Sequence, residues 1–152
     1  MKFPEWARGW LAGLIDGEGT ITVRYLKRRD GSRRYQPIIV ISNKERRLLE
    51  KVQELIGHGR ISSYGKYHIR RHPNWSQVYR LEIKGSRIVL EILQSVYPYL
   101  VIKRKQAELV MKICEINLQS MKKRKRNDEL RELVKYVKLL NKRGSLPPEG
   151  CS

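Results

Sequence analysis

Apolar residues in this chain alternate between helical spacing and every-second-position spacing. Over residues 5–16 the apolar side chains share one broad side and two glycines follow, so we expect a helix there. Residues 20–28 alternate and lead to the turn signal at residues 30–31, which predicts a strand and a hairpin. A second strand is expected over residues 35–42, although Pro37 is unusual inside a strand.

The same order repeats along the rest of the chain. Residues 42–45 have the form of a capping box and predict the start of a helix that ends at Gly57. The remaining expected elements are strands over residues 60–70 and 76–84, a short helix from Ser86 to Pro98, and helices over residues 103–119 and about 128–142.

This order predicts an α+β fold in which helices cover one face of a saddle-like, antiparallel four-stranded sheet. We expect a single domain over residues 1–152, with a core at about 5–120 and a tail at 144–152. The alternation places basic and polar side chains on the other sheet face: Thr22, Arg24, Arg28, Tyr64, Lys66, Arg70 and Arg80. Such a face favours contact with nucleic acid, and the alternative is a solvated surface.

The charge balance strengthens this interpretation. The chain has 33 lysines and arginines against 15 aspartates and glutamates, for a net charge of +18. An anionic partner is therefore expected, nucleic acid first, because neutralising phosphates releases condensed counterions. A membrane is not expected, since no apolar run approaches the ~20 residues of a membrane span. The two cysteines, Cys114 and Cys151, form no disulfide framework and favour an intracellular setting.

One short segment carries a specific resemblance. Residues 11–19 read Leu-Ala-Gly-Leu-Ile-Asp-Gly-Glu-Gly and closely resemble the signature of the LAGLIDADG homing endonucleases, with Gly17 and Glu18 as its two departures. Segments at 41–45, 79–83 and 103–106 also resemble the family, and the expected elements follow its αββαββα core. The resemblance covers roughly residues 5–120.

The resemblance implies an intron-encoded endonuclease. Such an enzyme hydrolyses both strands of double-stranded DNA at a long pseudo-palindromic target and leaves short 3′ overhangs. The chain carries one motif, so a homodimer is expected. The implied cofactor is Mg²⁺, with Mn²⁺ or Ca²⁺ as substitutes for binding. The alternatives are an RNA maturase that assists intron splicing and a catalytically inactive DNA-binding regulator; prokaryotic cytoplasm and organelle are both open as its location.

Site residues follow from the same resemblance. Glu18 is expected to bind the metal through its carboxylate, a hard ligand suited to Mg²⁺, and Gly17 through its carbonyl. The other expected catalytic residues are Lys103 near the cleavage centre, Asn43 beside active-site water, and Arg46 or Arg47 at the scissile phosphate. These four also have structural interpretations, as solvated charges or as a first-turn helix residue. Asp16 is the rival carboxylate, for which we expect structural bonds.

Two surfaces complete the expectations. Small residues share one side of the first helix, which predicts close approach of another backbone, and the family uses this helix as its dimer axis. The expected dimer residues are Gly9, Ala12, Gly13 and Asp16. The expected DNA-binding residues are Thr22, Arg24, Arg28, Arg33, Arg34, Gln36, Ser62, Tyr64, Lys66, His68, Arg70, Gln77 and Arg80. The basic run 122–126 is predicted to be a phosphate-contacting loop.

Overall fold

The computed structural model describes residues 2–64, 76–119 and 123–143. The elements are α1 (Glu5–Glu18), β1 (Gly19–Lys27), β2 (Arg33–Asn43), α2 (Arg46–Ile56), β3 (Arg60–Tyr64), β4 (Val78–Lys84), α4 (Ser86–Val96), the 3-10 turn η1 (Tyr97–Tyr99), α5 (Arg104–Leu118) and α6 (Lys123–Arg143). This order is the one predicted. Within these ranges no helix has the length and apolar composition needed to cross a bilayer.

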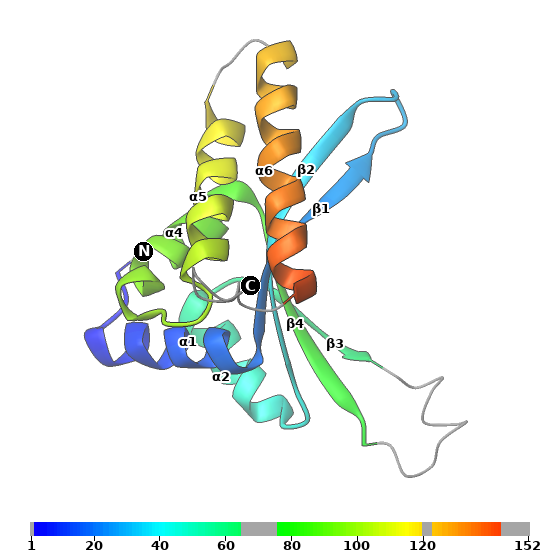
Figure 1. Cartoon of the computed structure of the whole chain (residues 1–152). Coiled ribbons are helices and arrows are strands. Elements are labelled where there is room, and N and C mark those ends of the chain that lie inside the picture. The colour runs from blue at the N-terminus through cyan, green and yellow to red at the C-terminus, as the bar shows by residue number, and fades with distance from the viewer. Residues whose placement is uncertain (1, 65–75, 120–122, 144–152) are drawn as a thin grey trace.

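The strands form one antiparallel sheet in the order β1-β2-β4-β3, which confirms the predicted α+β class. Ile21, Ile39 and Ile83 lie side by side across it and face the core. Because side chains alternate between faces along a strand, their neighbours in sequence belong to the opposite, open face. Helices α1, α2, α4 and α5 lie on the core side, and the sheet is curved (Figure 1).

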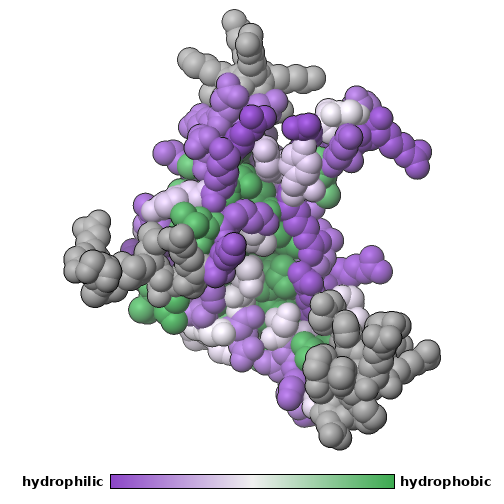
Figure 2. All heavy atoms as spheres, turned by 45° about the vertical axis from the view of Figure 1, so that its right-hand side comes forward, coloured by the Kyte–Doolittle hydropathy of each residue, from purple (hydrophilic) through white to green (hydrophobic). Residues whose placement is uncertain are grey.

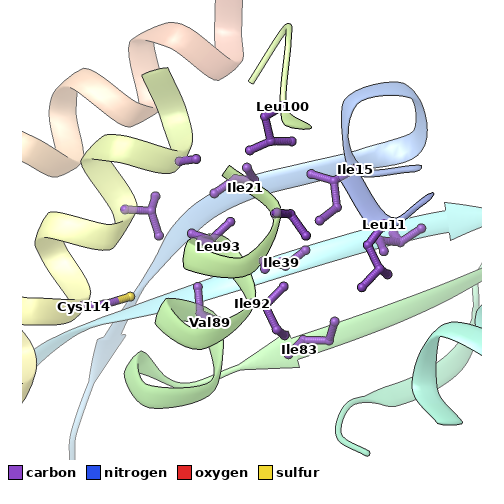
Figure 3. Packing of buried hydrophobic residues seen from close by; sticks show 14 of the residues in the cluster. Leu11, Ile15, Ile21, Ile39, Ile83, Val89, Ile92, Leu93, Leu100 and Cys114 are labelled. Carbon is purple, nitrogen blue, oxygen red and sulfur yellow. The ribbon is translucent and has the colours of Figure 1, made fainter. Parts of the chain in front are cut away.

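The core is filled by apolar residues that the helical and alternating spacings identify. Leu11 and Ile15 of α1 pack with Ile92 and Leu93 of α4 over the sheet (Figure 3). Cys114 of α5 is also fully buried, as its position on an apolar helix face predicts, and burial raises the pKa of its thiol to about 12. The C-terminal end of α1 is therefore packed against the sheet.

The position of Pro37 in β2 has a local explanation. The carbonyl of Pro37 accepts a hydrogen bond from the Gly85 main-chain N–H, which follows the last residue of β4. The N–H and C=O of one strand residue point to the same side, so the missing donor of Pro37 points past the end of β4. No bond between β2 and β4 is lost there, since their pairing begins at Ile38.

Helix α6 protects the edge strand β1. The side-chain amide of Asn141 donates to the main-chain carbonyl of Ile21 at 2.8 Å, and Lys138 Nζ donates to Thr22 Oγ1 at 3.3 Å. A covered edge is less open to pairing with other chains. The helix begins at Lys123, so the prediction of a basic loop is wrong for residues 123–126. Lysine and arginine are good helix formers, and the following segment extends into them.

The start of α2 also differs from the expectation. Ser42 belongs to β2, where it lies opposite Arg80, so it cannot cap the helix. The helix begins at Arg46, and Asn43 Oδ1 instead accepts the main-chain N–H of Glu45 at 2.8 Å. The strand continues further than its hydrophobic pattern indicates. The end of α2 is as predicted, because Gly57 follows it with φ of 72°, a left-handed conformation that favours glycine.

Candidate functional site

The motif places an acidic side chain at the junction of α1 and β1. Glu18 is the last residue of α1 and is exposed, and Gly17 lies inside the helix, one residue beyond its predicted end. Gly19 then enters β1 directly. A Cβ atom at Gly19 would lie 2.8 Å from both Cα and O of Ile15, so this tight helix-to-strand junction requires glycine. The junction fixes where the Glu18 carboxylate leaves the helix.

Asp16 connects α1 to the segment that precedes α5. Its Oδ2 accepts the main-chain N–H of Val101 at 2.8 Å, and its Oδ1 accepts those of Ile102 and Lys103 at 3.2 and 3.0 Å. Charge-assisted bonds of this kind are stronger than neutral ones. The structure thus gives Asp16 a structural role, and its carboxylate is occupied within the chain.

Lys103 caps the C-terminal end of α1. Its ammonium donates to the main-chain carbonyls of Ile15 and Asp16 at 2.9 and 2.6 Å. The last carbonyls of a helix lack intrahelical partners and attract cations. Partial burial lowers the pKa of Lys103, while the charges of Asp16 and Glu18 oppose that shift. An ammonium has three donors, so one remains for a water or a phosphate beside Glu18.

Removing the Asp16 carboxylate should destabilise the fold. We expect Asp16→Ala to lower the free energy of unfolding by about 1–3 kcal/mol, because three main-chain N–H groups lose their acceptor. Urea denaturation measures this. The control is Glu54→Ala, whose exposed carboxylate pairs only with Lys51 in the described structure, and it should change stability by no more than about 0.5 kcal/mol. Equal stabilities for the two variants would contradict the role assigned to Asp16.

The other three predicted catalytic residues lie around the start of α2. Arg46 pairs with Glu50 at 2.7 Å and lies over the Tyr79 ring. Arg47 lies 3.8 Å from the Glu45 carboxylate, and Asn43 accepts a hydrogen bond from the Glu45 main chain. The Arg47 side chain is 91% exposed. In the part of the chain that the structure describes, no hydrogen bond or ion pair links these residues to Glu18 or Lys103. Their catalytic roles stay predictions.

Six of the thirteen predicted DNA-binding residues share the open sheet face. By the strand registers, those on this face are Thr22, Arg24, Arg34, Gln36, Ser62 and Arg80. Arg28 follows β1 in the hairpin turn, and Gln77 precedes β4. The predictions for Lys66, His68, Arg70 and the Tyr64 side chain lie outside the described residues.

Arg33 does not belong to the open face. Arg33 lies opposite Lys27, and its guanidinium carbon lies 5.8 Å from the centre of the Tyr25 ring. Tyr25 follows Ile21 by four residues and therefore shares the core-side face. Side chains alternate between faces, so Arg34, its neighbour in sequence, occupies the open face. Contact of Arg33 with DNA stays a prediction, and it would have to come from the end of the hairpin and not from the open face.

Sequence reasoning missed an acidic residue at the centre of this face. Glu82 accepts hydrogen bonds from the terminal nitrogens of Arg24 at 2.5 and 3.3 Å, and Lys84 Nζ lies 2.7 Å away. Arg80 Nε lies 3.2 Å from Glu82 Oε1, without hydrogen-bond geometry. The Arg24 hydrogen bond, opposed by burial, lowers the pKa of Glu82 to about 2. The available signal was the Arg-Leu-Glu-Ile-Lys alternation, which puts all three β4 side chains on one face.

The outer side of α1 exposes apolar surface. Trp6 is 61% exposed, and in the segment bound by Asp16 Val101 and Ile102 are 79% and 58% exposed. Gly13 is exposed as well, with no atom within 4 Å of where its Cβ would be. Ala12, in contrast, is fully buried in the core of its own chain. Its side chain therefore cannot contact a second copy, although the sequence predicted that it would.

Comparisons with known proteins agree with this geometry. Residues 5–97 match a family model described as LAGLIDADG-like domain. The DNA endonuclease I-CvuI of Chlorella vulgaris is 28% identical over 108 residues, which span 68% of this chain and 61% of I-CvuI. The match therefore leaves more than a third of that relative's length uncovered.

Solved structures show the same fold. I-CvuI in complex with its target in the presence of calcium has a TM-score of 0.75 at 23% identity, over 90% of this chain and 82% of that one. The archaeal intron-encoded I-Vdi141I with DNA gives 0.69 at 22% identity, over 97% and 90%. I-SmaMI bound to uncleaved DNA with calcium gives 0.68 at 22% identity, over 97% of this chain but 47% of I-SmaMI.

The family model covers more than half of the chain, and it includes the helix that carries Glu18 and all of the sheet. The motif at residues 11–19 predicts the same family from the sequence. The chain belongs to the LAGLIDADG-like domain family.

Proposed function

We propose that this protein is a Mg²⁺-dependent homing endonuclease that, as a homodimer, cuts both strands of a long pseudo-palindromic DNA site. The observation that carries the proposal is the exposed Glu18 carboxylate beside the half-buried Lys103 ammonium at one end of α1. The similarity to the DNA endonuclease I-CvuI supports the reaction class.

The residues at this helix end suit a hydrated divalent cation. Among the described residues Glu18 makes no hydrogen bond or ion pair, and no group of three or more His, Cys, Asp or Glu side chains is positioned to hold a metal. A single carboxylate fits Mg²⁺, which keeps several waters and uses substrate phosphates as ligands. The carbonyl of Gly17, in the last turn of α1, has no partner within the helix and could add an oxygen.

The chemistry divides between the cation and the chain. Glu18 would hold the cation at the helix end, and a bound Mg²⁺ would supply the Lewis acidity that activates a water and stabilises a leaving oxygen. Lys103 keeps this end of α1 in place through two carbonyls and directs its third donor to a phosphate oxygen or to the attacking water.

The open sheet face is the surface proposed to bind DNA. Its side chains are predominantly hydrophilic on the side that comes forward in Figure 2. The chain as a whole has a net charge of +18, and neutralising DNA phosphates would relieve the repulsion among its cations. Base edges in the major groove can be read by arginine side chains on such a face.

A second copy of the chain is the proposed occupant of the apolar surface on α1. One chain carries one motif and one exposed Glu18, whereas cutting a duplex requires chemistry on two strands. The fold of this chain corresponds to only 47% of I-SmaMI, which leaves room in that chain for a second such unit. Packing α1 against its copy would bring two Glu18 side chains together and cover Trp6, Val101 and Ile102.

The proposal is tested with a library of duplexes that carry randomised, inverted half-sites. Cleaved ends are sequenced after incubation with Mg²⁺ and, as a control, with EDTA. We expect Mg²⁺-dependent cuts at one family of pseudo-palindromic sites, with short 3′ overhangs. Enrichment of bound but uncut DNA would instead indicate a regulator. A maturase would give neither cutting nor enrichment, and it would accelerate the splicing of an intron RNA.

Arg80 should contribute to base recognition. We expect Arg80→Ala to weaken binding of the best site by about 1–3 kcal/mol and to relax preference at one position in each half-site. The matched control is Arg87→Ala, which removes the same charge from α4 and should leave the preference profile unchanged. Profiles from library selection report both. If Arg80→Ala weakens all sequences equally, Arg80 contacts phosphates and not bases.

A further inference from the structure

The acidic residue on the open face belongs to a packed layer. Val40 lies opposite Glu82 and Ile38 opposite Lys84, both on this face, yet their exposures are only 7% and 0%. Other side chains therefore cover them. The Glu82 side chain is itself only 16% exposed. Its carboxylate is ionised at neutral pH, because its cationic neighbours lower its pKa to about 2.

Glu82 engages its two arginine neighbours in different ways. Arg24 directs both terminal nitrogens at the carboxylate, so the end of its guanidinium is occupied. Arg80 approaches Glu82 through Nε, and within the described structure its terminal nitrogens make no hydrogen bond. Both arginines line the same depression of about 320 Å³ between β1, β2 and β4. A guanidinium reads guanine best through two parallel N–H donors, which Arg80 retains.

We infer that Glu82 is a specificity-determining positioning residue, which holds Arg24 against the sheet and orients Arg80 to present its terminal nitrogens to a guanine. This inference rests on the proposed DNA-binding function. Without the carboxylate, Arg24 becomes a mobile cation that can bind the phosphates of any sequence. Arg80 loses the group that restricts its conformations, so its alignment with one base weakens.

Glu82→Gln preserves size and removes the charge. We expect discrimination at the base position read by Arg80 to fall at least ~5-fold, the lower range of one bidentate contact. Affinity for random-sequence duplex should rise. In a plot of the logarithm of the binding constant against the logarithm of the salt concentration, the slope should steepen by about one unit per subunit. A residue that only stabilised the fold would lower affinity for all sequences together.

The test compares preference profiles from the randomised half-site library for wild type, Glu82→Gln and Arg80→Ala, alone and combined. Glu54→Gln on α2 is the matched control, because it removes the same charge from an exposed side chain away from the sheet face. Its profile should equal that of wild type. In the Arg80→Ala background, Glu82→Gln should cause no further loss at the affected position. If Glu82→Gln does not fold, Glu82→Asp, which keeps the charge but withdraws it from Arg80, takes its place.

The outcomes separate this inference from the function it rests on. A wild-type preference that Glu82→Gln leaves intact contradicts the inference alone. A loss of equal size with and without Arg80 contradicts it too, since Glu82 would then act elsewhere. A wild-type protein that enriches no sequence contradicts the proposed function and the inference together. Relaxed preference that requires Arg80 supports both.

Discussion

Glu18→Gln is expected to abolish Mg²⁺-dependent cleavage while leaving DNA binding nearly unchanged. The substitution keeps the size of the side chain but removes the charge that attracts the cation, and losing metal assistance costs several kcal/mol of transition-state stabilisation. A fall of at least ~10³-fold in the single-turnover rate follows. Glu18 is exposed and makes no hydrogen bond or ion pair among the described residues, so the fold and the sheet face should remain intact. Quench-flow or gel-based cleavage at saturating protein gives the rate.

Binding and folding are measured on the same variant. Mobility shift in Ca²⁺ should give a dissociation constant within ~3-fold of wild type, since binding rests on many phosphate contacts. Glu54→Gln again serves as the charge-matched control and should cleave at the wild-type rate. Near-normal cleavage by Glu18→Gln would contradict the active-site assignment. Asp16 would then be the next candidate metal ligand, despite its three main-chain partners.

Local patterns in the sequence predict the elements and the core well. In β1, alternating burial from Gly19 to Val23 follows the alternating side chains, and in α2 the buried Leu49, Val52 and Ile56 follow helical spacing. Both patterns arise because each element has one apolar side that must be removed from water. The order of elements and the motif then identify the fold, and the motif locates Glu18.

Contacts between distant segments were not accessible from such patterns. Arg24 and Glu82 are 58 residues apart and lie on β1 and β4, with β2 between them. Their contact depends on strand order and on a side chain long enough to cross two inter-strand spacings of about 4.8 Å. The bonds from Asp16 to the segment before α5 span 85 to 87 residues and depend on how η1 turns the chain. Periodicity contains neither kind of information.

Errors in predicted boundaries came from residues with two compatible roles. Ser42 and Asn43 have the composition of a helix cap but pair in β2 with β4, because ladder bonds satisfy more main-chain groups there than a cap would. Ala12 fits a face of small residues, yet its side chain is buried in the core. The Ala12 side chain is therefore removed from the candidates for contact with another chain, whereas Gly9, Gly13 and Asp16 stay predictions.

Gly13→Leu is expected to separate the proposed homodimer without unfolding the monomer. Nothing in the described structure lies within 4 Å of a Cβ at Gly13, so the monomer accommodates the side chain, and replacing a helical glycine should stabilise α1 by about 0.5–1 kcal/mol. A second helix packed closely against this position would meet the leucine instead. Sedimentation should show the wild type near twice the 18.0 kDa of one chain and the variant near 18.0 kDa.

The opposite effects on stability and assembly make this prediction specific. Cleavage of both strands should fall at least ~100-fold in Gly13→Leu, because a monomer supplies only one Glu18. The variant also loses the apolar contact between the two copies, which is worth several kcal/mol. Gln94→Leu adds the same side chain at an exposed position of α4 and should change neither mass nor cleavage. Gly13→Ala, with only one added carbon, should lie between the two. If wild-type protein sediments as a monomer even when bound to DNA that it cuts on both strands, dimerisation through α1 is wrong.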